Sequence, residues 1–145
     1  MSLDECFRKG QLVNTEKSLQ KAAASIKIAK ENMDDAKVHL ENKLFNWAFI
    51  AAYTAMFHAS RALLFRDGIK ERSHFCLCTY VKEKYRGKVE AKYINELDIL
   101  REQRHSILYG DSDIRTKEVH EEEADTAIKL AEGYIKTVEK IIKGD

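Results

Sequence analysis

Helical hydrophobic spacing that no proline interrupts is the feature that most constrains how this chain can fold. The 145 residues contain no proline and only six glycines. Proline and glycine are the residues that most often form the tight turns between strands, so few such turns are expected. From Leu19 to Leu40, apolar residues recur at three- and four-residue steps, and lysines and glutamates fill the opposite face. The sequence therefore predicts an all-α protein built from long helices.

Capping residues and glycines set the expected limits of five helices. Asn14 or Thr15 is a suitable first N-cap, Gly68 ends the second helix, Ser73 caps the third and Thr116 caps the last. The helices are expected to cover about residues 14–40, 44–65, 74–86, 89–109 and 116 onward.

Nothing in the sequence divides the chain into separate units. It has no internal repeat, low-complexity tract or long linker. Residues 1–13, which precede the first expected helix, should fray or pack loosely. We therefore expect one helical domain over residues 1–145.

The second expected helix has an unusually small apolar face. Its stripe consists of Ala48, Ala51, Ala52, Ala55, Ala59 and Ala62. Small side chains let a neighbouring helix approach closely. Ala55 and Ala59 are therefore expected to lie at a helix–helix contact.

Charge is distributed unevenly, although the whole chain is nearly neutral. The net charge is +1, from 25 basic and 24 acidic residues. Between residues 70 and 92, basic residues outnumber acidic ones by seven to three; Tyr80 and Tyr85 lie among them, and Tyr93 follows directly. Such a surface could bind a phosphate backbone and stack bases, and an ordinary solvated helix face fits the pattern equally well. The candidate nucleic-acid contacts are Lys82, Lys84, Arg86, Lys88 and Arg101.

The cysteines indicate a reducing compartment. Cys6, Cys76 and Cys78 make an odd count, and the last two are too close in sequence for an ordinary structural disulfide, so they are expected to pack as small hydrophobic groups. A zinc site with His74 is not favoured, because alternate positions on a helix diverge and no fourth ligand is spaced nearby. No secretion signal or apolar run of membrane-spanning length is evident. We expect a soluble cytoplasmic protein without metal, cofactor or membrane contact.

Other candidate sites have simpler interpretations. No phosphate-binding glycine loop, dinucleotide fingerprint or nucleophile elbow occurs. The glutamates at 121–123, which follow His120, fan over about 200° of a helix, which favours a solvated first turn over a metal cluster. His58 lies between Phe57 and Ala59 and is expected to be a hydrogen-bonded core or interface histidine.

The segment 96–111 carries the residues best suited to chemistry, because Arg104, His105 and Tyr109 lie near the end of a predicted helix. A guanidinium binds phosphate, a neutral imidazole can move protons near pH 7, and a phenol donates a hydrogen bond. On a regular helix His105 and Tyr109 share a face, whereas Arg104 and Tyr109 point about 140° apart. One site therefore needs either a helix that unwinds before Gly110 or a second copy across a two-fold axis. We favour the second copy.

Arg104 also falls on the apolar stripe of its helix, together with Leu97, Leu100 and Ile107. A charge is costly to bury without a partner. The side chain is therefore expected to face a second subunit or a ligand.

Several segments resemble one family along nearly the whole chain. They are AYTAMFHASRALL at residues 52–64, followed by Gly68 and Ser73-His74; the 10–12 segment before an alanine-rich helix; and the segment 104–111. Together they resemble the HEPN family, in its small stand-alone prokaryotic branch. The resemblance implies an antiparallel, up-and-down four-helix bundle with a short additional helix, which is usually a homodimer.

The same resemblance implies a function. Such proteins are often encoded beside a minimal nucleotidyltransferase in toxin–antitoxin modules, and active members are metal-independent ribonucleases whose motifs meet at the dimer interface. Their signature is an arginine, a polar residue, three further residues and a histidine. Arg104 matches the arginine and His105 the polar position, but Tyr109 stands where the histidine is expected. A phenol, with a pKa near 10, is a poor general base at neutral pH.

The leading hypothesis is therefore a HEPN homodimer that binds RNA or a nucleotide, in a module with a nucleotidyltransferase partner. The rival hypothesis is a metal-independent ribonuclease toxin that uses Arg104 with His105. A third is a non-catalytic structural or inhibitory partner protein that contacts no nucleic acid.

Overall fold

The computed structural model describes residues 1–110 and 118–144, and within these ranges it contains six helices and two short strands. Their bounds are α1 Leu3–Arg8, β1 Leu12–Asn14, α2 Leu19–Glu41, α3 Phe45–Asp67, β2 Ile69–Glu71, α4 His74–Lys84, α5 Ala91–Tyr109 and α6 Glu121–Ile142. The prediction of an all-α fold is confirmed. The four long helices α2, α3, α5 and α6 are the predicted ones, and α4 is the shorter additional helix.

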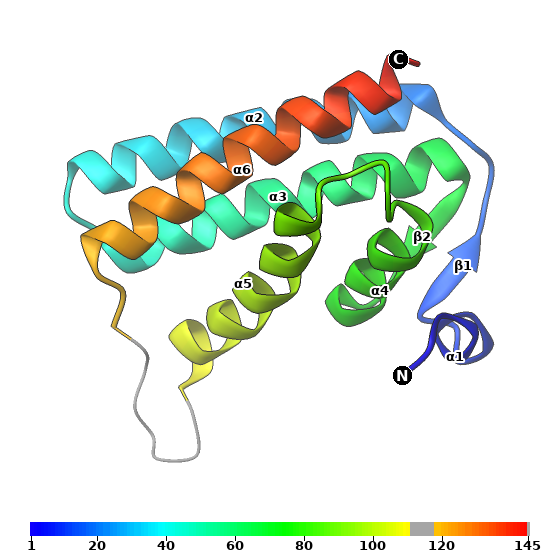
Figure 1. Ribbon diagram of the computed structural model, residues 1–145, viewed down its shortest axis with the longest axis horizontal. Coiled ribbons are helices and arrows are strands. Elements are labelled where there is room, and N and C mark those ends of the chain that lie inside the picture. The colour runs from blue at the N-terminus through cyan, green and yellow to red at the C-terminus, as the bar shows by residue number, and fades with distance from the viewer. Residues whose placement is uncertain (111–117, 145) are drawn as a thin grey trace.

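The helices form two layers (Figure 1). The long-helix layer consists of α2, α3 and α6, which lie side by side and contact one another. The α4–α5 layer consists of α1, α4 and α5; α4 and α5 both pack on α3, and α1 packs on α4. Helix α3 therefore has a neighbour on most of its sides and is the centre of the core.

Small residues line the contacts of α3, as its alanine stripe predicts. Ala48, Ala52, Ala55, Ala59 and Ala62 are fully buried. The buried side chains of α2 and α6 combine further alanines with larger apolar residues such as Met33, Ile128 and Tyr134, which fill the space between the backbones.

Helix α3 ends, and helix α4 begins, at the residues that the sequence predicts. Gly68 ends α3 with a left-handed backbone (φ 79°), where a Cβ atom would lie 2.7 Å from the carbonyl oxygen of Thr15. The Cys76 N–H donates to the Ser73 hydroxyl over 3.1 Å and so caps α4.

Two predicted helix starts are wrong. Helix α2 begins at Leu19, capped by Ser18, rather than near Asn14, because residues 12–14 form strand β1. Helix α6 begins at Glu121, not after Thr116, which itself lies outside the described residues. The His120 N–H donates to a carboxylate oxygen of Glu123 over 3.3 Å at this start.

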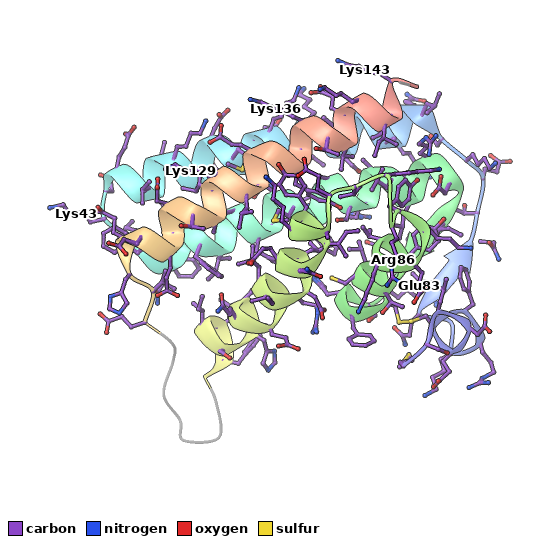
Figure 2. The ribbon with its side chains drawn as sticks, in the orientation of Figure 1. Lys43, Glu83, Arg86, Lys129, Lys136 and Lys143 are labelled. Atoms are coloured by element: carbon purple, nitrogen blue, oxygen red, sulfur yellow. A yellow bond between two sulfur atoms is a disulfide. The ribbon has the colours of Figure 1, made fainter. Side chains whose placement is uncertain are left out.

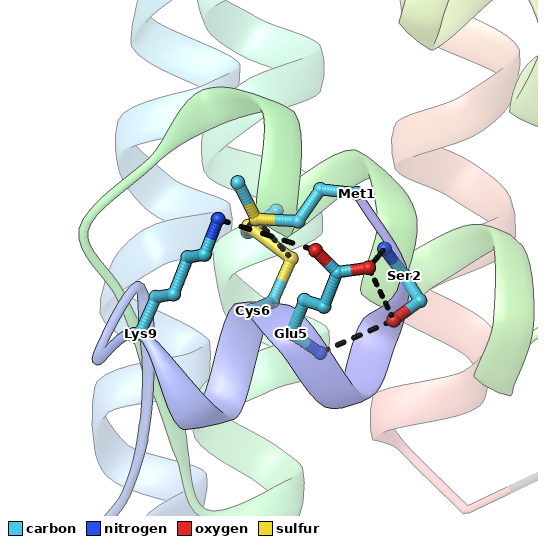
Figure 3. Close-up of polar contacts among 6 residues, drawn as sticks. Met1, Ser2, Glu5, Cys6 and Lys9 are labelled. Atoms are coloured by element: carbon cyan, nitrogen blue, oxygen red, sulfur yellow. Dashed lines mark hydrogen bonds and ion pairs between the residues drawn. A yellow bond between two sulfur atoms is a disulfide. The ribbon is translucent and has the colours of Figure 1, made fainter.

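The N-terminal segment is ordered and attached, contrary to the expectation that it frays. Ser2 and Glu5 form a capping box at the start of α1 (Figure 3). Strand β1 pairs antiparallel with β2, in a register that sets Leu12 opposite Glu71. A disulfide joins Cys6 of α1 to Cys76 of α4, so the expectation of unpaired cysteines is wrong for these two. The reducing compartment inferred from unpaired cysteines stays a prediction.

Helix α3 is long and apolar enough to cross a membrane by length and composition, contrary to the expectation that no apolar run of that length occurs. Within this fold it is the central helix, and 61% of its most apolar window is buried inside the protein. Its hydrophobicity is therefore accounted for by the core.

Candidate anion-binding site

Helix α5 carries Arg104 toward the inside of the α4–α5 layer. Leu97, Leu100 and Ile107 on the same stripe are buried, and Arg104 is half-buried among them. Its guanidinium carbon lies 5.8 Å from the centre of the Tyr53 ring on α3, a cation–π distance. The prediction that this side chain lies on the apolar stripe is confirmed.

A histidine that the sequence analysis did not assign to this site lies next to Arg104. His74 is the first residue of α4, and its Nδ1 lies 2.7 Å from the Tyr53 hydroxyl. Its ring stacks on Phe57, with the centroids 4.2 Å apart and the planes inclined by 19°. Hydrogen bonding and stacking together fix the orientation of this imidazole.

Burial determines the protonation of both partners. It raises the pKa of Tyr53 far above its usual value, so the phenol keeps its proton. Burial, and then the nearby charges of Arg104 and Arg101, lower the pKa of His74, so the imidazole is neutral near pH 7. In the tautomer in which Nδ1 accepts from the Tyr53 hydroxyl, the imidazole proton is on Nε2, where it can be donated to a ligand.

Two other arginines near this site, Arg101 and Arg61, are paired with carboxylates. Arg101 lies 3.1 Å from Asp98, and Arg61 lies 2.7 Å from Glu71. Among the residues that the structure describes, no carboxylate forms an ion pair with Arg104. A half-buried cation without a counter-ion is suited to binding an anion from outside.

His105 and Tyr109 lie on a different side of α5 from Arg104. Their rings are 5.0 Å apart, as the spacing predicts, and Tyr109 is 68% exposed. Helix α5 remains regular up to Tyr109 and ends at Gly110, so the alternative in which it unwinds earlier is wrong. Within one subunit, Arg104 does not share a site with His105 and Tyr109.

The predicted nucleic-acid contacts are spread over two places. Lys82 and Lys84 lie in the last turn of α4, and Arg86 and Lys88 follow in the loop to α5; all four are exposed (Figure 2 labels Arg86). A surface cavity of about 540 Å³ is lined by Lys82, Arg86 and Lys88, among others. Arg101 is on α5, where it pairs with Asp98 and lies over Phe75, and both of these partners line a second surface cavity together with Lys82.

The prediction that tyrosines of the basic stretch stack on bases is wrong. Tyr80, Tyr85 and Tyr93 are only 5%, 2% and 7% exposed. The hydroxyls of Tyr80 and Tyr85 both donate to Oδ2 of Asp67, over 2.9 and 2.6 Å, which holds their rings inside the protein.

The remaining candidate groups do not assemble into a metal site. Across the described residues, no three His, Cys, Asp or Glu side chains gather closely enough to hold a metal ion. Cys76 is bonded to Cys6, so its sulfur is not a free thiol. Burial raises the pKa of the Cys78 thiol to about 12, which disfavours the thiolate that binds metals. His58 is half-buried, and its Nδ1 is buried without a hydrogen-bond partner in the described part of the chain, contrary to the expected hydrogen-bonded histidine.

Comparison with known proteins identifies the family. The HEPN domain matches residues 22–141 of this chain, from the first turn of α2 to the end of α6. The chain belongs to the HEPN family.

Two relatives of this HEPN protein match most of its length. One is a protein of Methanocaldococcus jannaschii whose name describes it as a candidate toxin; it is 31% identical over 125 residues, which cover 83% of this chain and 87% of the relative. The other is the UPF0332 protein of Thermotoga maritima, 31% identical over 117 residues, which cover 79% and 86%. The HEPN match includes Arg104 and His74 but not Cys6, so half of the disulfide lies outside the matched region.

Proposed function

We propose that this HEPN protein is a toxin-like protein that binds RNA, or a nucleotide, through a phosphate held at Arg104. The observation that carries the proposal is the half-buried Arg104 guanidinium, which forms no ion pair with any described residue and lies beside the neutral imidazole of His74. The name of the Methanocaldococcus jannaschii relative supports the toxin-like part of the proposal.

A phosphate suits this site better than a carboxylate ligand of similar charge. Arg104 offers a planar pair of N–H donors, and Nε2–H of His74 offers a third donor from another direction. Because His74 carries no charge, it adds a hydrogen bond without adding repulsion to the arginines. Three donors around one group match the several oxygens of a phosphodiester.

The protein is proposed to act as a homodimer. His105 and Tyr109 are exposed together and point away from Arg104 in their own subunit. A second copy related by a two-fold axis could bring its His105 and Tyr109 to the Arg104 of the first. The nucleotidyltransferase partner and a cytoplasmic location remain proposals that rest on the family resemblance and on the sequence.

A metal-independent ribonuclease is the second candidate function, and His74 is the observation that favours it. The motif histidine is replaced by Tyr109, but His74 places an imidazole beside Arg104 within one subunit. His105, the sequence-based candidate, would reach Arg104 only from a second copy. Imidazole is the side chain that most readily exchanges protons near pH 7.

Cleavage of single-stranded RNA in the presence of EDTA separates the two functions. We expect the wild type to bind RNA without cleaving it. Tyr109→His restores the family signature and should create or raise cleavage, and adding Arg104→Ala to that variant should abolish it. His120→Ala, which changes an exposed histidine at the start of α6, is the control.

Strong cleavage by the wild type that is lost in His74→Gln or His105→Ala would favour the ribonuclease. A monomer at micromolar concentration would contradict the composite site. If the wild type shows no RNA binding even at low salt, the non-catalytic structural partner is the better account.

A further inference from the structure

Basic side chains line the cavity of about 540 Å³ at the corner where the chain passes from α4 to α5, which we call the corner cavity. Lys82 comes from the last turn of α4, and Arg86 and Lys88 come from the loop that follows. None of these three side chains forms an ion pair with a described residue. The corner cavity therefore gathers three positive charges that have no counter-ion in the described part of the chain.

The acidic residues of this region do not cancel that charge. Glu90 is the only acidic residue among the described residues that line the corner cavity, and it lies 3.6 Å from Lys92. The second surface cavity, of about 210 Å³, shares Lys82 but adds the acidic residues Glu83 and Asp98. An anion is therefore expected to bind in the corner cavity and not in its neighbour.

The loop that carries Arg86 and Lys88 is held in place by the protein. The backbone carbonyl of Tyr85 accepts from the N–H groups of Lys88 and Val89, each over 3.0 Å. The Tyr85 hydroxyl donates to Asp67 of α3 over 2.6 Å, and Val89 is only 2% exposed. The loop backbone is thus positioned in advance, and only the cationic side chains have to become ordered when an anion binds.

The charge and size of the corner cavity suit the phosphorylated end of a nucleic-acid chain. A terminal phosphate monoester carries about 1.5–2 negative charges at pH 7, whereas an internal phosphodiester carries only about one. Sites for small organic ligands usually have volumes of about 300–1,000 Å³, so the corner cavity has room for a nucleotide as well as its phosphate. Val89 and Ile94, both buried, form an apolar part of its wall against which the nucleotide can pack.

We propose that the corner cavity binds the terminal phosphate of an RNA strand whose internal phosphate is held at Arg104. Both places lie along α5, because Ile94 in the cavity wall and Arg104 are ten residues apart on this helix, about 15 Å. Arg101 and Asp98, which lie between them, neutralise each other. The inference rests on the proposed function, because it takes RNA bound at Arg104 as its starting point.

The terminal phosphate is tested with three RNAs of the same single-stranded sequence and the same internal fluorescent label. One carries a 5′-phosphate, one carries a 3′-phosphate, and one has hydroxyl groups at both ends. We expect the wild type to bind one of the phosphorylated RNAs about tenfold more tightly than the hydroxyl RNA, measured by anisotropy, with a salt slope steeper by about one. The end that gains affinity gives the direction of the strand. Equal affinities for all three RNAs would contradict the proposal.

Variants of the lining locate the terminal phosphate. Arg86→Gln and Lys88→Gln should each reduce the preference for the phosphorylated RNA by about threefold or more, and together they should abolish it. Lys84→Gln is the matched control, because Lys84 is an exposed cation of the same stretch that does not line the corner cavity. An equal reduction in the control would show general attraction and no defined site. Urea unfolding of each variant separates lost binding from lost folding.

Competition with AMP separates an RNA end from a free nucleotide, because AMP carries the same phosphate monoester without the rest of the strand. AMP should displace the phosphorylated RNA only at concentrations far above the Kd of the RNA. Displacement at concentrations similar to that Kd would assign the corner cavity to free nucleotides, and the assignment to an RNA end would be wrong.

The outcomes also distinguish this inference from the function beneath it. Arg104→Ala should weaken binding of all three RNAs by the same factor and leave the preference for the phosphorylated end intact. If Arg104→Ala weakens binding but the wild type shows no such preference, the corner cavity is wrong and the phosphate site at Arg104 stands. If the wild type binds none of the RNAs even at low salt, both are wrong.

Discussion

Small apolar side chains fill most of the contacts of α3 within the long-helix layer of this HEPN protein, where Ser60 and Tyr134 also share a buried hydrogen bond of 2.7 Å. The α4–α5 layer is instead joined to itself and to α3 by a disulfide, tyrosine hydroxyls and stacked rings. In the first layer, alanines of α3 such as Ala55 and Ala59 let α2 and α6 pack closely. In the second, Cys6 is bonded to Cys76, and Tyr53 is hydrogen-bonded to His74.

The difference concerns what each kind of packing can do. Apolar contacts stabilise without fixing the direction of any polar group. Hydrogen bonds and ring stacking do fix direction, and Tyr53 and Phe57 of α3 hold the His74 imidazole of α4 in this way. The candidate site thus lies where the α4–α5 layer meets α3 through specific contacts.

The largest expected effect is on the α4–α5 layer. Cys6→Ser removes a disulfide that closes a sequence separation of 70 residues, and the chain-entropy model gives a loss of about 4 kcal/mol in the free energy of unfolding. Urea unfolding with and without reductant measures it. Reductant should destabilise the wild type and leave the variant unchanged. An equal response of both would mean that the disulfide does not attach α1 in solution.

The next largest effect concerns the long-helix layer. Ala55→Leu or Ala59→Leu inserts three carbon atoms where α3 meets its neighbours, and should cost about 1–3 kcal/mol of unfolding free energy. Ala24→Leu, at an exposed position of α2, is the control and should change little. Unchanged midpoints and slopes for both buried variants would contradict the close packing of this layer.

The third prediction has a smaller expected effect and compares how charges on the surfaces of the two layers contribute to RNA binding. Reversing Lys82, Lys84 and Arg86 to glutamate should weaken RNA binding by about tenfold, roughly 1.4 kcal/mol, and reduce its salt dependence. The matched control reverses Lys129 and Lys136 of α6 and Lys143, the residue directly after this helix, all of which lie on the other layer (Figure 2). Equal losses in both triple variants would indicate general electrostatic attraction and no preferred surface.

The smallest effect is the pH dependence of stability. Burial lowers the pKa of both His58 and His74 below 6.5, so the unfolded chain binds more protons than the folded one in that range. Stability from these groups is fully present above about pH 6.5 and is lost as the pH falls toward their folded pKa values. Urea unfolding of His58→Gln and His74→Gln should show a shallower loss on acidification. The same loss as in the wild type would show that the imidazoles are solvated.

Local sequence signals predicted the features that depend on near neighbours. The end of α3 at Gly68, the cap of α4 at Ser73 and the shared face of His105 and Tyr109 all follow from spacing within a few turns. The side of α5 that carries Arg104 follows from the same periodicity.

Features that depend on distant pairing were missed. Strand β1 exists because residues 12–14 pair with residues 69–71, so α2 starts later than its cap residues suggested. The disulfide and the Tyr53–His74 bond join residues 70 and 21 positions apart. Tyr80 and Tyr85 turn inward because Asp67 at the end of α3 accepts their hydroxyls. No local pattern specifies such partners.

The measurement that tests the central claim most directly is the salt-dependent affinity of single-stranded RNA for the wild type, Arg104→Ala and Lys136→Ala. Both variants remove one positive charge, but Lys136 is an exposed residue of α6 in the long-helix layer (Figure 2). We predict that Arg104→Ala weakens binding by about tenfold or more and lowers the magnitude of the salt slope by about one, while Lys136→Ala binds like the wild type. Equal affinities and slopes for the two variants would contradict a phosphate site at Arg104.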